Sequence, residues 1–194
     1  DSGVESRSTS TQSSESPGIS VFGGIFYGVL SVIAGFIGVV ALFINRLPSQ
    51  VNLQDVISDE YVVELFAWLF YNAHGYGDYT VDIVEKFSGQ SRSFNWLKEL
   101  PVGETLHFHL IPAALLFFGG LLLARKRSTP ISGFVAGASV AIGYAPILIG
   151  GSFFFTVSEA GFSAGPELQS TILIACLAYP VGVGGLAGII SGSS

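Results

Sequence analysis

The sequence predicts an all-α membrane protein, a four-transmembrane-helix bundle with an extracytoplasmic segment that contains a short interfacial helix. Of its 194 residues, 49% are hydrophobic and only 11% are charged, whereas soluble proteins carry roughly 25% charged residues. Four runs contain no Asp, Glu, Lys or Arg: residues 16–45, 105–124, 128–158 and 168–194. Each run reaches the roughly 20 residues that a helix needs to cross the hydrocarbon of a bilayer.

The chain begins with a polar tail and a first span. Residues 1–18 are dominated by Ser and Thr, so they are predicted to form a disordered cytoplasmic tail. The first transmembrane helix, residues 19–44, is too long for the apolar core of a signal peptide and should remain as an anchor. Within it, Gly24 and Gly28 share one helix face, where a neighbouring helix can approach closely. That neighbour is either a second copy of the chain or another helix of the same bundle.

Residues 45–104 form an acidic external segment, with nine acidic and four basic residues and therefore a net charge of −5. The Ser-Asp-Glu sequence at 58–60 is typical of a helix start and predicts a helix at about 59–73. Because this helix is aromatic and too short to span a membrane, we expect it at the membrane surface or tucked against the outer end of the bundle. Residues 80–87 mix strand and helix periodicity, so their structure stays open.

Three further spans follow, at residues 105–124, 130–155 and 170–190. Each contains a proline, which predicts a kinked or broken helix. Glycines recur at four-residue spacing in the last two spans, which favours close helix contacts in a compact bundle. The residues concerned are Pro112 in the second span, Gly133, Gly137 and Pro146 in the third, and Pro180, Gly184 and Gly188 in the fourth.

The short hairpin at 125–129, between the second and third spans, sets the predicted topology. It contains Arg125, Lys126 and Arg127, and short loops rich in Lys and Arg stay in the cytoplasm. The second span should therefore run from outside to inside. It follows that both chain termini are cytoplasmic, and that the acidic segment and the loop at 156–169 are external. The predicted location is the cell membrane, which the chain crosses several times.

The third and fourth spans share a pattern that suits a conduit. Tyr144 and Pro146 precede a glycine pair, Tyr179 and Pro180 precede another, and the prolines and the glycine pairs are both offset by 34 residues. Broken helices in inverted repeats are where transporters bind substrate, although coincidence in glycine-rich helices also accounts for the pattern. Pumps and coupled carriers usually have ionisable groups inside their spans. No Asp or Glu lies within a span here, which argues against a transporter of this kind.

The three histidines are the weak candidates for a metal site. His74, His107 and His109 lie near the predicted outer surface, where imidazole and carboxylate groups suit a transition metal. However, residues two apart on a helix point about 200° apart, so His107 and His109 cannot easily share a metal ion. We expect hydrogen bonding or helix-end packing instead, with no metal and no cofactor. The chain has no GK[ST], CxxC or HExxH motif, which favours a non-enzymatic protein.

Several segments resemble an uncharacterised family of small four-span integral membrane proteins from halophilic archaea. The resemblance rests on the stretch Trp-Leu-Phe-Tyr-Asn-Ala-His at 68–74, on Pro112 with the glycine pair at 119–120 in a leucine-rich span, and on Gly-Tyr at 143–144. The acidic external segment and the low lysine content are similar in style. The resemblance covers residues 19–194 and implies an architecture and a halophilic setting, but no activity.

Two classes of function remain open. The first is a non-enzymatic assembly or accessory subunit that packs through glycine-rich helix faces against a second copy or another membrane protein. The second is a small channel or facilitator built around the proline-broken helices. A conduit requires Tyr144 and Tyr179 to face a continuous polar cavity, whereas a subunit requires a solid core. The net charge of −6 argues against nucleic acid as a partner, which leaves the lipid bilayer and membrane proteins.

Overall fold

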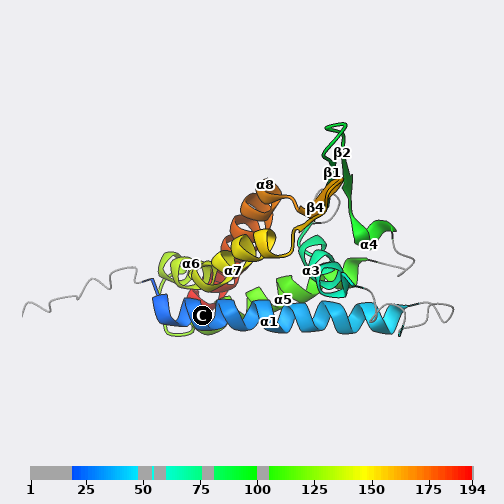
Figure 1. The fold of residues 1–194 in the computed structure, drawn as a ribbon. Coiled ribbons are helices and arrows are strands. Elements are labelled where there is room, and N and C mark those ends of the chain that lie inside the picture. The colour runs from blue at the N-terminus through cyan, green and yellow to red at the C-terminus, as the bar shows by residue number, and fades with distance from the viewer. Residues whose placement is uncertain (1–18, 48–53, 55–59, 76–80, 100–104, 194) are drawn as a thin grey trace, which may run out of the picture.

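The computed structural model describes residues 19–47, 54, 60–75, 81–99 and 105–193 (Figure 1). The predicted tail at 1–18 and the predicted helix start at 58–59 lie outside the described residues. The helices are α1 (Val21–Arg46), α3 (Val62–Asn72), α4 (Trp96–Glu99), α5 (Leu106–Ala124), α6 (Pro130–Ala138), α7 (Ala141–Phe154), α8 (Leu168–Ser170), the π-helix η1 (Thr171–Gly184) and α9 (Gly185–Gly192). The strands are β1 (Val81–Glu85), β2 (Ser91–Phe94), β3 (Val157–Ser158) and β4 (Phe162–Pro166).

Within these described residues, four helical segments are long and apolar enough to cross a membrane, as predicted. They are Val21–Arg46, Leu106–Ala124, Pro130–Phe154 and Leu168–Gly192. The third segment combines α6 and α7, and the fourth combines α8, η1 and α9. Between 28% and 44% of the most apolar window of each segment is buried inside the protein, so most of their apolar surface faces outward. That outward surface is what a helix in lipid presents to hydrocarbon chains.

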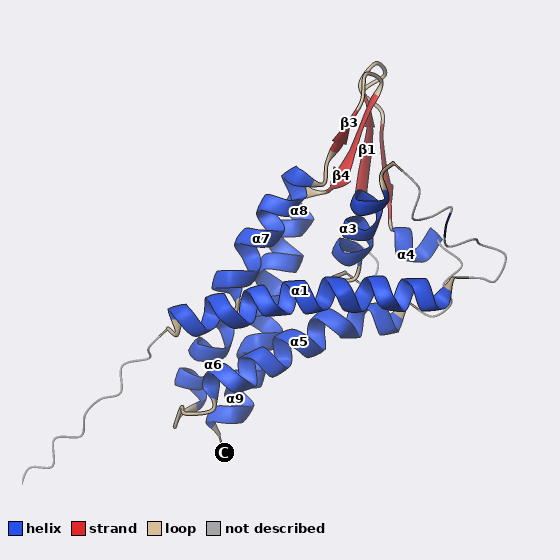
Figure 2. Ribbon diagram, turned by 60° about the horizontal axis from the view of Figure 1, so that its bottom comes forward, coloured by secondary structure: helices blue, strands red, loops and turns tan. Residues whose placement is uncertain are grey.

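The spans diverge toward one end of the bundle. Figures 1 and 2 show α1 running beside α5, while α7 leans away from them toward the end that carries the sheet. At the other end the fourth span packs on the hairpin, where Gly192 lies against the backbone oxygen of Thr129. Ser20, which precedes α1, lines a hollow together with the basic hairpin. The bundle is therefore closed at the hairpin end and open at the sheet end.

Helix α3 fills the opening between α1 and α7 (Figure 2). Every side chain from Ala67 to Ala73 is buried. Seven consecutive positions point in all directions around a helix, so this part of α3 is enclosed on every side. The C-terminal half of α3 is therefore packed between the spans, which is closer to the second expected position, tucked against the outer end of the bundle. Its continuous aromatic and apolar sequence is what such an enclosed site requires.

A small antiparallel sheet corrects the prediction of an all-α protein. Its strand order is β2-β1-β4-β3, and β1 pairs with β4 with Val81 opposite Pro166. The turn between β1 and β2 uses Gly89 at φ 68°, which glycine adopts without steric cost. Within the open segment at 80–87, residues 81–85 form a strand, and the loop predicted at 156–169 contains two more. Trp68 of α3 packs under this sheet and joins it to the bundle.

The third span breaks earlier than its proline predicts. The chain tightens between α6 and α7, where the Val140 amide donates to the Gly137 oxygen at 3.3 Å and the Ser139 hydroxyl donates to the Ala136 oxygen at 2.6 Å. Pro146 lies inside α7 without ending it. In the fourth span, Pro180 lies within the π-helix η1, whose wider turns accommodate a missing amide donor. The fourth span therefore stays continuous through its proline.

Candidate functional site

The six glycines predicted to pack helices lie at contacts between helix backbones of the same chain. A methyl group added at each would meet a backbone oxygen of a neighbouring helix or of the turn beside it. The pairs are Gly24 with Ser139, Gly28 with Val140, Gly133 with Gly188, Gly137 with Gly184, Gly184 with Gly137 at 2.7 Å, and Gly188 with Gly133. These glycine faces are therefore occupied inside the bundle, where they join α1 to the start of α7 and α6 to the fourth span.

The imidazole of His74, at the end of α3, is a fully buried polar group. Its Nδ1 lies 2.8 Å from the Phe70 oxygen and its Nε2 lies 2.5 Å from the Tyr144 hydroxyl. Because a carbonyl can only accept, Nδ1 carries the proton and Nε2 accepts from Tyr144. Burial lowers the pKa of His74 to about 4, against the smaller opposing effect of the Phe70 hydrogen bond. The ring is therefore neutral at pH 7, as this hydrogen-bond pattern requires.

Two further side chains of α3 hold the third span. The Tyr71 hydroxyl donates to the Leu148 oxygen at 2.5 Å, and the Trp68 indole donates to the Phe155 oxygen at 2.8 Å. Burial raises the pKa of Tyr71, so its hydroxyl stays protonated and remains a donor. Together with the hydrogen bond between His74 and Tyr144, these two hydrogen bonds attach one face of α3 to α7 and to the residue that follows α7.

The remaining histidines do not join His74 in a metal site. His109 is buried, and its Nδ1 lies 2.9 Å from the Ala73 oxygen, so it attaches α5 to the end of α3. His107 is exposed on the other side of α5, as the angle between positions two apart requires. Across the described ranges, no group of three or more His, Cys, Asp or Glu side chains is placed to hold a metal ion.

Of the residues proposed for a conduit, the two tyrosines lie against His74. Tyr144 is fully buried and bonded to His74, and the Tyr179 ring centroid lies 5.3 Å from the His74 ring centroid. Pro180 is buried and Pro146 is exposed on the outside of α7. Five cavities formed by the described residues are lined by other side chains. The arrangement is a packed polar cluster that joins α3, α7 and η1.

The basic hairpin lies beside the start of α1. Arg125, Lys126 and Arg127 line a hollow of about 370 Å³ with Ser20 and the leucines that end α5. This position brings the positive charges to the end of the bundle at which α1 begins and α9 ends. The cytoplasmic orientation of that end remains a prediction from its charge.

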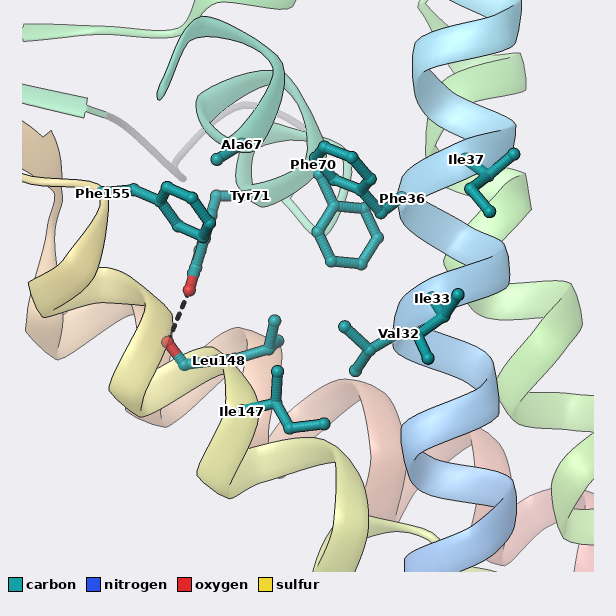
Figure 3. A pocket seen from close by; sticks show the side chains of 10 residues that line it. All are labelled: Val32, Ile33, Phe36, Ile37, Ala67, Phe70, Tyr71, Ile147, Leu148 and Phe155. Atoms are coloured by element: carbon teal, nitrogen blue, oxygen red, sulfur yellow. Dashed lines mark hydrogen bonds between the residues drawn. The ribbon is translucent and has the colours of Figure 1, made fainter. Parts of the chain in front are cut away.

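A cavity that could not be predicted from the sequence lies between α1, α3 and α7 (Figure 3). Its volume is about 370 Å³, and ten side chains line it, four from α1, three from α3 and three from α7 and the residue that follows it. Nine are apolar, and the tenth is Tyr71, whose hydroxyl is bonded to the Leu148 oxygen. Three segments that lie far apart in the chain line this cavity, so no local sequence pattern could have predicted it.

A family model described as "family of unknown function (DUF7978)" matches residues 4–194. The chain belongs to this family. The match covers all four apolar spans, α3 and the sheet. No curated protein and no solved structure matches the chain. Family membership agrees with the uncharacterised family expected from the sequence and carries no activity with it.

Proposed function

We propose that this protein is a non-enzymatic assembly or accessory subunit of the cell membrane, whose bundle anchors and orients an external sheet. The observation that carries the proposal is that polar side chains of α3 and of the residues that follow it form hydrogen bonds to the third span. His74, Tyr71 and Trp68 all bind partners that fix α3 between the spans, and Trp68 also packs under the sheet. Such contacts give a rigid support rather than a reacting group.

The tip of the sheet is the surface we propose for the partner. Phe87, in the turn between β1 and β2, exposes 88% of its surface. Next to it, the Lys86 amino group donates to the Ser158 hydroxyl at 2.9 Å and to the Glu159 backbone oxygen, which fixes the turn against the loop between β3 and β4. Burying this exposed aromatic ring against another protein would be favourable, because it removes apolar surface from water. The glycine faces already contact other helices of the same chain, so we assign assembly to the sheet tip and not to them.

The test is purification of the tagged protein in a mild detergent, with mass spectrometry of what copurifies and light scattering for its mass. We expect a complex, either with a second membrane protein or with further copies. Phe87→Ser should reduce the complex several-fold, whereas Gln90→Ser, an exposed change in the same turn, should leave it intact. A protein that stays monomeric and brings down no partner would contradict the proposal.

A small channel or facilitator is the alternative, and the polar cluster around His74 between two proline-containing spans is what favours it. It is less well supported, because Tyr144 exposes none of its surface and its hydroxyl is bonded to His74. Purified protein in liposomes distinguishes the two functions. After a hyperosmotic shift with a salt or a neutral solute, the subunit role predicts that these liposomes shrink and re-swell at the same rates as protein-free liposomes.

The proposed setting is a membrane in which both chain termini face the cytoplasm. The basic hairpin supports this orientation, since it lies at the same end as the start of α1 and opposite the sheet. The acidic external segment, with its net charge of −5, also suits the saline surroundings of a halophilic archaeon.

A further inference from the structure

The cavity between α1, α3 and α7 opens sideways from the bundle. Its deep wall is made by buried side chains, including Phe70 and Leu148, each 2% exposed. Its rim is made by Ile33, Ile37 and Ile147, which expose 53%, 60% and 37% of their surface. Ile33 lies at the midpoint of α1. If α1 crosses the bilayer, this opening faces the hydrocarbon interior rather than water.

The chemistry of the walls selects among the molecules that can reach this opening. Water and polar ligands find no free donor at the one polar side chain that lines it, because the Tyr71 hydroxyl already donates its proton to the Leu148 oxygen. A helix from another protein is about 10 Å across and too thick for a cavity of about 370 Å³. That volume is more than twice the roughly 150 Å³ of an apolar cavity that binds benzene, so a flexible hydrocarbon chain fits.

A second hollow continues the cavity along the outside of α1. It has a volume of about 410 Å³, is lined by α1 side chains from Phe22 to Ile33, and shares Ile33 with the first cavity. Apolar lining therefore extends from the hairpin end of α1 to the middle of the span, where it meets at Ile33 the cavity between α1, α3 and α7. This is the course of a lipid chain whose head group lies at the membrane surface near the start of α1.

From this continuity we infer that the cavity between α1, α3 and α7 is a binding site for one hydrocarbon chain of a membrane lipid. The chain lies along α1 and inserts its end between Phe70 and Leu148. It completes the packing of α3 in the opening of the bundle. The inference does not depend on the proposed function, since a subunit, a channel or any other four-span protein could carry such a site.

The test uses the full-length protein in nanodiscs that contain a phospholipid with a diazirine near the end of one acyl chain. After photolysis, we expect adducts on the buried wall residues Val32, Phe70 or Leu148. Ile147→Trp, which fills the rim, should lower these adducts several-fold. Ile189→Trp on α9, where the native side chain is 36% exposed, should leave them unchanged.

Three outcomes would overturn the inference. One is that adducts appear only on outward side chains such as Phe22. Another is that Ile147→Trp has no effect on the wall adducts. The third is that the wall residues carry no lipid adduct, which would mean that the cavity is empty or holds something other than a lipid chain. Should Ile147→Trp fail to fold, Ala67→Leu fills the cavity from the α3 side and must give the same several-fold loss.

Discussion

Replacing Gly137 by alanine should separate α6 from the fourth span and destabilise the protein by about 1–3 kcal/mol or more, the range found for overpacked sites. The added methyl group would collide with the backbone oxygen of Gly184 and lie 3.0 Å from the Cα of Gly188. Because backbone atoms cannot rotate away as a side chain can, the helices must move apart. Thermal unfolding in detergent, followed by loss of soluble folded protein, measures the change.

Gly150→Ala on α7 is the matched control for this prediction. A methyl group there meets nothing within 4 Å, and alanine favours a helix over glycine by up to about 1 kcal/mol. We therefore expect equal or slightly higher stability. Equal losses at Gly137 and Gly150 would mean that glycine itself, and not the close contact of α6 with the fourth span, matters at these positions.

His74→Ala should produce the second large effect, on the order of 3 kcal/mol. It removes a fully buried ring, with the cavity cost that follows, and it leaves the Tyr144 hydroxyl without its acceptor. Tyr144→Phe keeps the ring and removes only the hydrogen bond, so its cost should be about 1 kcal/mol. A His74→Ala protein as stable as the wild type would show that α3 does not depend on this cluster.

The same residue predicts a pH dependence of stability. The pKa of His74 falls to about 4 in the folded protein from about 6.5 in an unfolded chain. Between these values the unfolded state binds more protons, so stability is complete above pH 6.5 and falls as the pH drops toward 4. The shift corresponds to roughly 3 kcal/mol. Carboxyl groups also titrate in this range, so the measurement is the difference between wild type and His74→Gln, which should lack this part of the pH dependence.

The sequence predicted the spans because each is a local property. Runs such as 105–124 without a charged residue are decided by the solvent that they require, and no distant contact can change that requirement. The spacing of Gly133 and Gly137 likewise predicted a close helix contact, although it could not say which helix would be the neighbour. In the structure these glycines meet Gly188 and Gly184 of the fourth span.

The sheet and the position of α3 could not be predicted in this way. Strand β1 pairs with β4, which lies about eighty residues later in the chain, with Ile83 opposite Ala164. The sequence around β1 alone does not contain this partner. The aromatic sequence of α3 suits a membrane surface as well as a buried site, and the choice is made by partners such as Leu148 and His109. The third span breaks at residues 139–140, where α1 crosses it with Gly24 against Ser139, and not at Pro146, which lies inside α7.

The central claim is that α3 is enclosed between the spans, and a cysteine scan tests it most directly. The native Cys176 is first replaced by alanine, and single cysteines are placed at each position from 67 to 73 and at Val63, which is 54% exposed. Reaction with a membrane-impermeant maleimide should occur at 63 and at none of the seven buried positions. Reactivity that recurs every three or four residues through 67–73 would place α3 on the surface and contradict the account.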